Sequence, residues 1–133
     1  MDDFELYDPT SPIFYHRINE FIMILKKHRD LFGVSALDVG CGGGVSAFAL
    51  EKIGLNVVGI DPLKEMIERA LKAREILGSH VEFVNSDAES FKTDSRFDSI
   101  FFLGNVIVHL GINALISSIR NLEKFLSLGG TLV

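Results

Sequence analysis

The chain alternates short apolar runs with longer segments in which apolar residues recur at helical spacing. The apolar runs, each of strand length, lie at 35–39, 56–60, 81–85, 97–103 and from 131 onward. The helical segments lie at 12–31, 45–53, 63–77 and 112–126. Strands that alternate with such helices are joined by right-handed crossovers and form a parallel sheet. Near-continuous apolar strands indicate helices on both faces. The sequence therefore predicts a doubly wound parallel α/β sheet.

Composition supports a single domain over residues 1–133, in which 1–33 form an arm and a first helix. Hydrophobic residues make up 47% and charged residues 23% of the chain, as in globular domains. The net charge of -5 disfavours nucleic acid and anionic membranes as partners. The lone cysteine, Cys41, excludes an internal disulfide and suits a reducing compartment. The N-terminus is acidic, unlike a secretory signal, and no apolar stretch reaches the roughly 20 residues that cross a bilayer. We therefore expect a cytoplasmic protein.

A glycine-rich loop follows the first predicted strand. Residues 38–44 read Asp-Val-Gly-Cys-Gly-Gly-Gly, the pattern D-x-G-x-G-x-G. Glycines permit positive φ and remove the Cβ atoms from the path of a ligand that lies across the backbone. The loop leads into a helix N-terminus, where free N–H groups favour negative charge. We interpret the loop as a ligand cradle. The alternative is a tight turn without a ligand, which needs fewer glycines.

Acidic residues follow the next two predicted strands. Asp61 closes the second strand, where an acid accepts hydrogen bonds from the ribose hydroxyls of an adenosine. The alternative for Asp61 is an N-cap of a helix that Pro62 starts, and the two roles are compatible. Asp87 and Ala88 follow the third strand. A carboxylate there can accept from the adenine amine, and a backbone N–H can meet a ring nitrogen. The alternative for Asp87 is a solvated loop acid.

Together these motifs resemble those of the class I methyltransferases that use S-adenosylmethionine, in particular the type 11 group with the quinone-biosynthesis O-methyltransferases. The stretch 37–44 is similar to the first motif of that family almost letter for letter. The later motifs match in order and spacing at 59–61, 87–88, 97–100 and 128–131. The resemblance covers residues 34–133. It implies a Rossmann-like sheet with five of its strands in the order 3-2-1-4-5.

The resemblance also implies a function, namely methyl transfer from S-adenosylmethionine to a small-molecule acceptor, with S-adenosylhomocysteine as product. In the family pattern Asp38 orients the methionine ammonium through water, Asp61 holds the ribose hydroxyls, and Asp87 with Ala88 reads the adenine. Asn105 falls where the family contacts the methionine backbone. The implied cofactor-binding residues are Asp38, Gly40, Cys41, Gly42, Gly44, Asp61, Pro62, Asp87, Ala88 and Asn105.

The chain departs from the family pattern in two places. Many relatives carry the arrangement E-x-L-E-H after the fourth strand, whereas 104–109 read Gly-Asn-Val-Ile-Val-His. His109 is retained and the acids are not. His109 is the candidate general base, because its pKa range suits proton removal. The family sheet also has two further strands at one edge, which we expect this chain to lack. We expect a second copy or a partner chain to cover that edge.

Other functions remain open at this stage. In a shifted register Gly42-x-Gly44-x-x-Ala47 satisfies the fingerprint G-x-G-x-x-A of NAD-dependent oxidoreductases. That register places Asp38 in an apolar strand and gives Asp87 no role. A non-catalytic module that binds the cofactor or a partner is the other alternative, because function resides in the site rather than in the fold. The histidines have no spacing typical of a metal site, and none is expected.

Overall fold

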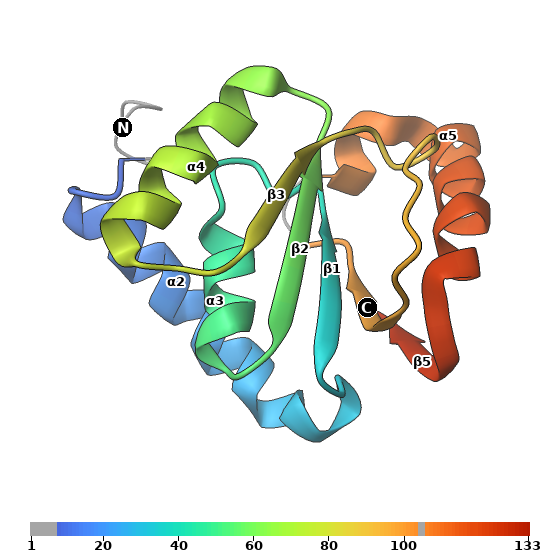
Figure 1. The fold of residues 1–133 in the computed structure, drawn as a ribbon, viewed down its shortest axis with the longest axis horizontal. Coiled ribbons are helices and arrows are strands. Elements are labelled where there is room, and N and C mark those ends of the chain that lie inside the picture. The colour runs from blue at the N-terminus through green and yellow to red at the C-terminus, as the bar shows by residue number, and fades with distance from the viewer. Residues whose placement is uncertain (1–7, 104–105) are drawn as a thin grey trace.

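Five parallel strands form the centre of the molecule (Figure 1). The computed structural model describes residues 8–103 and 106–133, and for 106–110 the backbone alone. The strands are β1 (Ser35–Val39), β2 (Asn56–Asp61), β3 (Glu82–Asn85), β4 (Phe97–Phe101) and β5 (Leu126–Leu132). Their order in the sheet is β3-β2-β1-β4-β5. The predicted parallel sheet and its strand order are confirmed.

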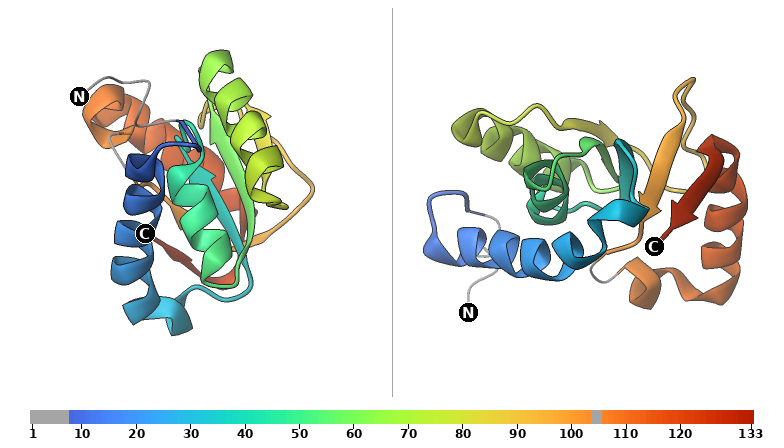
Figure 2. Two further views of the ribbon diagram at one scale, coloured as in Figure 1. Left: turned by 90° about the vertical axis from the view of Figure 1, so that its left-hand side faces the viewer. Right: turned by 90° about the horizontal axis from the view of Figure 1, so that it is seen from below.

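Helices cover both faces of the sheet, as predicted (Figure 2). One face carries α2 (Pro12–Leu25), α3 (Val45–Lys52) and α4 (Lys64–Leu77), and the other carries α5 (Val106–Leu122). Because side chains alternate along a strand, Ala36 of β1 packs into the core on the side of α2, α3 and α4, and Leu37 packs into the core on the side of α5. This two-sided burial explains why the strands read as continuous apolar runs.

The first helix is shorter than its sequence pattern predicts. The predicted helix over 12–31 is wrong after Leu25, where a 3-10 segment, η1 (Lys26–Leu31), replaces it. The tighter turn brings Arg29 against two loops. Its Nε donates to the carbonyl of Ile53 at 2.7 Å, and its Nη1 donates to that of Gly33 at 2.7 Å. These bonds hold the entry to β1 against the end of α3.

The C-terminal strand begins earlier than predicted. The expected helix over 112–126 begins where predicted, because Gly111 (φ 71°, ψ 167°) interrupts α5 and a separate helical segment follows it. The expected end is wrong, because α5 stops at Leu122 and the 3-10 turn η2 (Glu123–Phe125) leads into β5. Leu126 pairs with Phe97 of β4, so it belongs to the sheet. Gly129, expected to stop the helix, instead adopts a φ of 79° in an irregular part of β5. A Cβ on Gly130 would lie 2.9 Å from the carbonyl oxygen of Ser127, which explains the second glycine.

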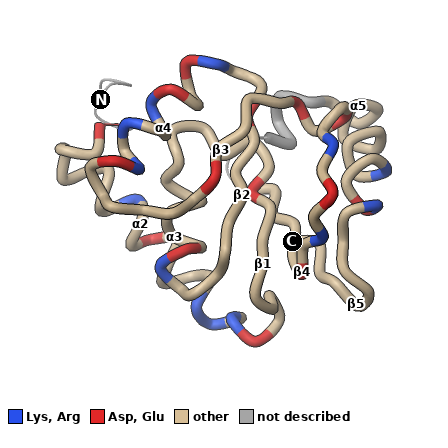
Figure 3. Tube along the Cα trace, viewed as in Figure 1, with Lys and Arg blue, Asp and Glu red and all other residues tan. Residues whose placement is uncertain are grey.

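The surface bears charges of both signs. Basic and acidic residues both occur along α4, and the basic residues of η1 are followed by Asp30 (Figure 3). In the described residues, no helix is long and apolar enough to cross a membrane. β3 and β5 form the edges of the sheet, and the expected partner along the β5 edge stays a prediction.

Candidate functional site

The glycine loop lies between the carboxyl end of β1 and the start of α3. Gly40, Gly42 and Gly44 have φ values of 71°, 54° and 100°, a region that side chains with a Cβ rarely enter. A Cβ on Gly44 would lie 2.6 Å from Cε2 of Phe48. The loop therefore requires glycine for its own shape, and its backbone surface carries few side-chain atoms.

Hydrogen bonds tie this loop to the end of β2. The N–H groups of Gly40 and Cys41 both donate to the carbonyl of Ile60, at 2.8 and 3.0 Å. The N–H of Gly42 donates to Oδ2 of Asp61 at 2.9 Å. Three consecutive backbone donors thus already have acceptors within the protein. A loop with its donors so occupied is poorly suited to hold a phosphate, which needs free N–H groups.

Asp38 is the most unusual group of the site. Its side chain is completely buried at the end of β1. The hydroxyl of Ser46, in the first turn of α3, donates to Oδ2 at 2.5 Å. In the described part of the chain, Oδ1 has no hydrogen-bond partner. Burial raises the pKa of Asp38 to about 7, the Ser46 hydrogen bond lowers it, and the charge of Asp61 raises it further.

Asp61 joins the glycine loop to the segment before α4. Its two oxygens accept from different backbone donors, Oδ2 from Gly42 and Oδ1 from the N–H of Leu63 at 2.9 Å. The helix begins at Lys64 and not at Pro62, and its N-cap residue is Leu63. The N-cap alternative for Asp61 is therefore wrong in detail. Because a carboxylate accepts about four hydrogen bonds, Asp61 retains acceptor capacity for a ligand.

The two hydrogen bonds that Asp61 accepts from Gly42 and Leu63 can be tested directly. Asp61→Asn replaces one accepting oxygen with an amide nitrogen, which leaves either the Gly42 or the Leu63 N–H without an acceptor. We expect the free energy of unfolding to fall by about 1–3 kcal/mol, measured by urea denaturation. The matched control is Asp98→Asn, because Oδ2 of Asp98 alone accepts from both Val34 and Ser35. An asparagine oxygen can keep both bonds there, so equal losses in the two variants would contradict the assignment.

The turn after β3 lies beside Asp61. The N–H of Ser86 and the Asn85 side-chain amide donate to the Asp61 carbonyl, at 3.1 and 2.9 Å. Asp87 is exposed, and its Oδ1 accepts from the N–H and hydroxyl of Ser90, at 2.8 and 2.7 Å. These hydrogen bonds lower the pKa of Asp87. Ala88 is buried. The predicted acids Asp61 and Asp87 thus lie at the carboxyl ends of the neighbouring strands β2 and β3.

Sequence reasoning missed two residues that support the site. Ser46 contacts Asp38 directly. Asn121, near the end of α5, donates through Nδ2 to the carbonyls of Ala88 and Phe91, at 2.8 and 3.0 Å. It thereby braces the turn after β3 from the opposite face of the sheet. Ser46 is the one polar residue in the otherwise apolar stretch 45–50, which is a signal that the sequence contains. No comparable signal in the sequence indicates the role of Asn121.

Cys41 is buried within the glycine loop, and burial is the main cause that raises its pKa. A Cβ on Gly59 of β2 would lie 3.0 Å from Cys41 Sγ, so the thiol fills the space that this glycine leaves. Such a thiol is a poor nucleophile.

The side chains of two candidate residues are not described by the structure. Asn105 lies outside the described residues, and of His109 only the backbone, within α5, is described. Their roles stay predictions.

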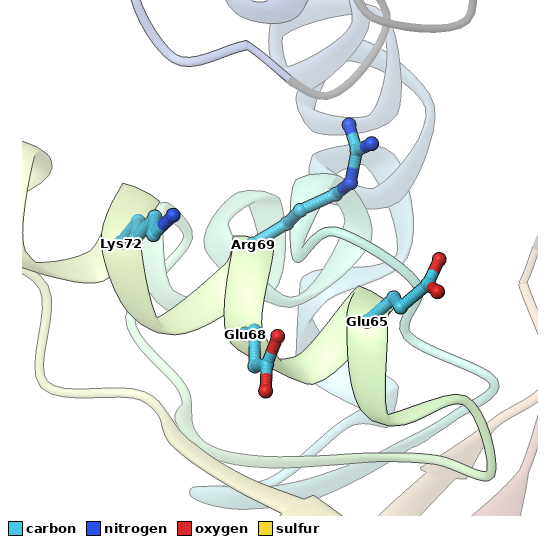
Figure 4. Close-up of a pocket in the computed structure, with 4 residues that line it drawn as sticks. All are labelled: Glu65, Glu68, Arg69 and Lys72. Carbon is cyan, nitrogen blue, oxygen red and sulfur yellow. The ribbon is translucent and has the colours of Figure 1, made fainter.

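A surface hollow elsewhere on the molecule does not coincide with this site. It is lined by Glu65, Glu68, Arg69 and Lys72, which all project from α4 (Figure 4). None of these is a predicted site residue, and the lining mixes both charges. Among the described residues, no three His, Cys, Asp or Glu side chains gather where they could hold a metal ion.

The fold and the site define a class: a doubly wound α/β domain with a glycine loop and acids at the strand ends, as in domains that bind adenosine cofactors. A family model described as a methyltransferase domain matches residues 36–130. The chain is 33% identical over 135 residues to a ubiquinone biosynthesis O-methyltransferase of Rickettsia felis, covering 86% of this chain and 55% of the relative. The chain therefore belongs to the class I S-adenosylmethionine-dependent methyltransferase family.

Solved structures agree with this assignment. The PH0226 protein of Pyrococcus horikoshii matches with a TM-score of 0.83 and 30% identity, over 98% of this chain and 61% of that one. The magnesium protoporphyrin IX methyltransferase of Synechocystis, solved with bound S-adenosylhomocysteine, shares the fold at a TM-score of 0.69 and 24% identity, over 84% of this chain and 52% of that one. The chain thus spans about half the length of the relatives it matches.

Proposed function

We propose that this chain binds S-adenosylmethionine at the glycine loop and serves methyl transfer to a small-molecule acceptor. The observation that carries the proposal is Asp38, a buried acid beside the glycine loop, with one oxygen that has no partner among the described residues. A buried acceptor without a partner is costly, so the atom calls for a donor that the described residues do not supply. The methionine part of the cofactor carries an ammonium, which supplies the missing donor and the opposite charge.

The charge of the site separates this cofactor from a nicotinamide dinucleotide. Asp38 and Asp61 lie under the loop, and the N–H groups of Gly40, Cys41 and Gly42 donate within the protein. A pyrophosphate would meet two carboxylates and find these donors occupied. S-adenosylmethionine has no phosphate and carries positive charges on its sulfonium and its ammonium. The site therefore favours the methyl donor.

The remaining contacts follow from the positions of the acids. Asp61 accepts from the ribose hydroxyls while it keeps its two backbone bonds. Asp87 and the N–H of Ala88 recognise the adenine, on a turn that Ser90 and Asn121 hold in place. When bound, the cofactor supplies an electrophilic methyl group for in-line displacement. The chain contributes positioning and exclusion of water, and His109 stays the candidate base.

Two observations favour one class of methyl acceptor. The net charge of -5 disfavours a nucleic-acid substrate, and the matched Rickettsia felis relative is named for ubiquinone biosynthesis. Both favour a small molecule.

Calorimetry with the purified chain tests the proposal. We expect S-adenosylmethionine and S-adenosylhomocysteine to bind at micromolar concentrations and NAD not to bind. Transfer of a labelled methyl group to small phenolic and amine acceptors then tests the reaction itself. Binding of NAD, or no binding of S-adenosylhomocysteine, would refute the proposed cofactor. Cofactor binding without transfer to any acceptor would reduce the chain to a binding module.

A further inference from the structure

The first turn of α3 places a polar group among apolar ones. Every residue from Val45 to Leu50 is buried, and Ser46, with 7% of its surface exposed, is the one polar side chain among them. Its hydroxyl donates to Oδ2 of Asp38. The Ser46 hydroxyl is held in place because α3 packs between the sheet and α2. Phe48 of α3 contacts Phe14 of α2.

We propose that Ser46 is a positioning residue for cofactor binding: it pins one oxygen of Asp38 and so presents the other, Oδ1, to the cofactor's ammonium. The inference rests on the proposed function. Without the Ser46 bond, the carboxylate of Asp38 is free to rotate, and neither oxygen has a fixed place. With the bond, Oδ2 is engaged, and Oδ1 is the oxygen that has no hydrogen-bond partner among the described residues.

Ser46 also favours the charged form of Asp38, which the ammonium requires. Burial and the carboxylate of Asp61 at the end of β2 both raise the pKa of Asp38, and the Ser46 hydrogen bond lowers it. Cys41, the other titratable group beside it, has a raised pKa and carries no charge near neutral pH. The balance leaves the Asp38 pKa at about 7. Loss of the hydroxyl therefore moves this pKa upward.

This balance gives cofactor binding a characteristic pH dependence. A ligand that binds ionised Asp38 must displace its proton below the pKa, so affinity falls by up to about tenfold per pH unit on the acid side. For the wild-type chain the fall begins near pH 7. For Ser46→Ala it begins at a higher pH, because the same carboxyl holds its proton more tightly.

The experiment measures the affinity for S-adenosylhomocysteine by calorimetry between pH 6 and pH 9.5. We expect Ser46→Ala to move the midpoint upward by about one pH unit, which lowers the affinity about fivefold at pH 7 and much less at pH 9.5. Ser46→Thr keeps the hydroxyl and restores the wild-type midpoint. Ser118→Ala is the matched control, because that buried serine donates to the carbonyl of Ala114 within α5 at 2.7 Å; its midpoint stays at the wild-type value.

A second readout needs no ligand. Carbon NMR of the Asp38 carboxyl, assigned by comparison with Asp38→Asn, follows its titration in the free protein, and we expect the same upward movement in Ser46→Ala. An unmoved midpoint in a variant that folds and binds would overturn the role of Ser46. If Ser46→Ala does not fold, Ser46→Cys, a poor donor of similar size, replaces it with the same expected shift. Failure of the proposed function is distinct, since the wild-type chain would then bind no S-adenosylhomocysteine at any pH.

Discussion

Gly44→Ala lowers the free energy of unfolding by about 4 kcal/mol, from backbone strain and from overlap of the new methyl group. Gly44 has a φ of 100°, and a Cβ there would lie 2.6 Å from Phe48 Cε2 and 3.1 Å from Phe83 Cζ. The two rings pack edge to face, with centroids 5.6 Å apart. Neither ring can move without opening the core beneath α3. The measurement is urea denaturation followed by circular dichroism.

Gly78→Ala is the control for the contribution of backbone strain to the loss of stability. Gly78 ends α4 with a φ of 64°, and a Cβ there would meet nothing within 4 Å. Its variant carries the left-handed strain without the overlap, so we expect a loss of about 1–2 kcal/mol. Equal losses in the two variants would show that the packing of Phe48 and Phe83 against the loop has been misread.

The strand positions were predictable from the sequence because of where each strand lies. β1 and β2 are central, so both of their faces are buried, and burial on both faces leaves the uninterrupted apolar run that was used to locate them. The strand order came from the family resemblance, since hydrophobic spacing alone does not determine which strands are neighbours.

The start of β5 was not predictable from local spacing. Leu122 and Leu126 keep the i, i+4 interval of a helix, yet the helix ends at the first and the strand begins at the second. What decides the boundary is the pairing of Leu126 with Phe97. That contact is distant in sequence, so no window of local residues contains it.

In the site, residue types were predictable and their bonds were not. Asp38 and Asp61 were recognised because acids at strand ends are exceptional in apolar surroundings. Both carboxylate oxygens of Asp61 accept hydrogen bonds from backbone N–H groups. This arrangement depends on how the glycine loop turns back toward β2. Ser46 reaches Asp38 through the same turn. A hydroxyl on a helix has many possible partners, and only the folded loop selects one.

Asp38→Asn changes stability and cofactor affinity in opposite directions. In the unfolded chain an aspartate titrates near its ordinary pKa of 3.8, and in the folded chain burial raises the pKa to about 7. Between these values the folded state holds a proton that the unfolded state has lost. The wild-type stability therefore falls as pH rises from about 4 to about 7 and then levels off. Asparagine does not titrate and shows no such fall.

The size of this effect follows from the displacement of the pKa from 3.8 to about 7. One pH unit corresponds to about 1.4 kcal/mol, so the wild-type chain loses on the order of 4 kcal/mol relative to Asp38→Asn between pH 4 and pH 8. The measurement is urea denaturation of both proteins across this range. Asp30→Asn makes the same substitution at an exposed position in η1, and its stability curve runs parallel to that of the wild type.

The affinity for S-adenosylhomocysteine falls in the same variant. An asparagine offers no charge to the ligand's ammonium, and a buried pair that loses one partner costs about 3–5 kcal/mol. We expect binding at pH 8 to weaken by at least about 100-fold, while Asp30→Asn binds as the wild type does. If Asp38 is buried for the sake of cofactor binding, its replacement by asparagine makes the protein more stable and weakens the binding of its ligand. If Asp38→Asn bound normally, the carboxylate would have no part in the cofactor site, and its burial would need another explanation.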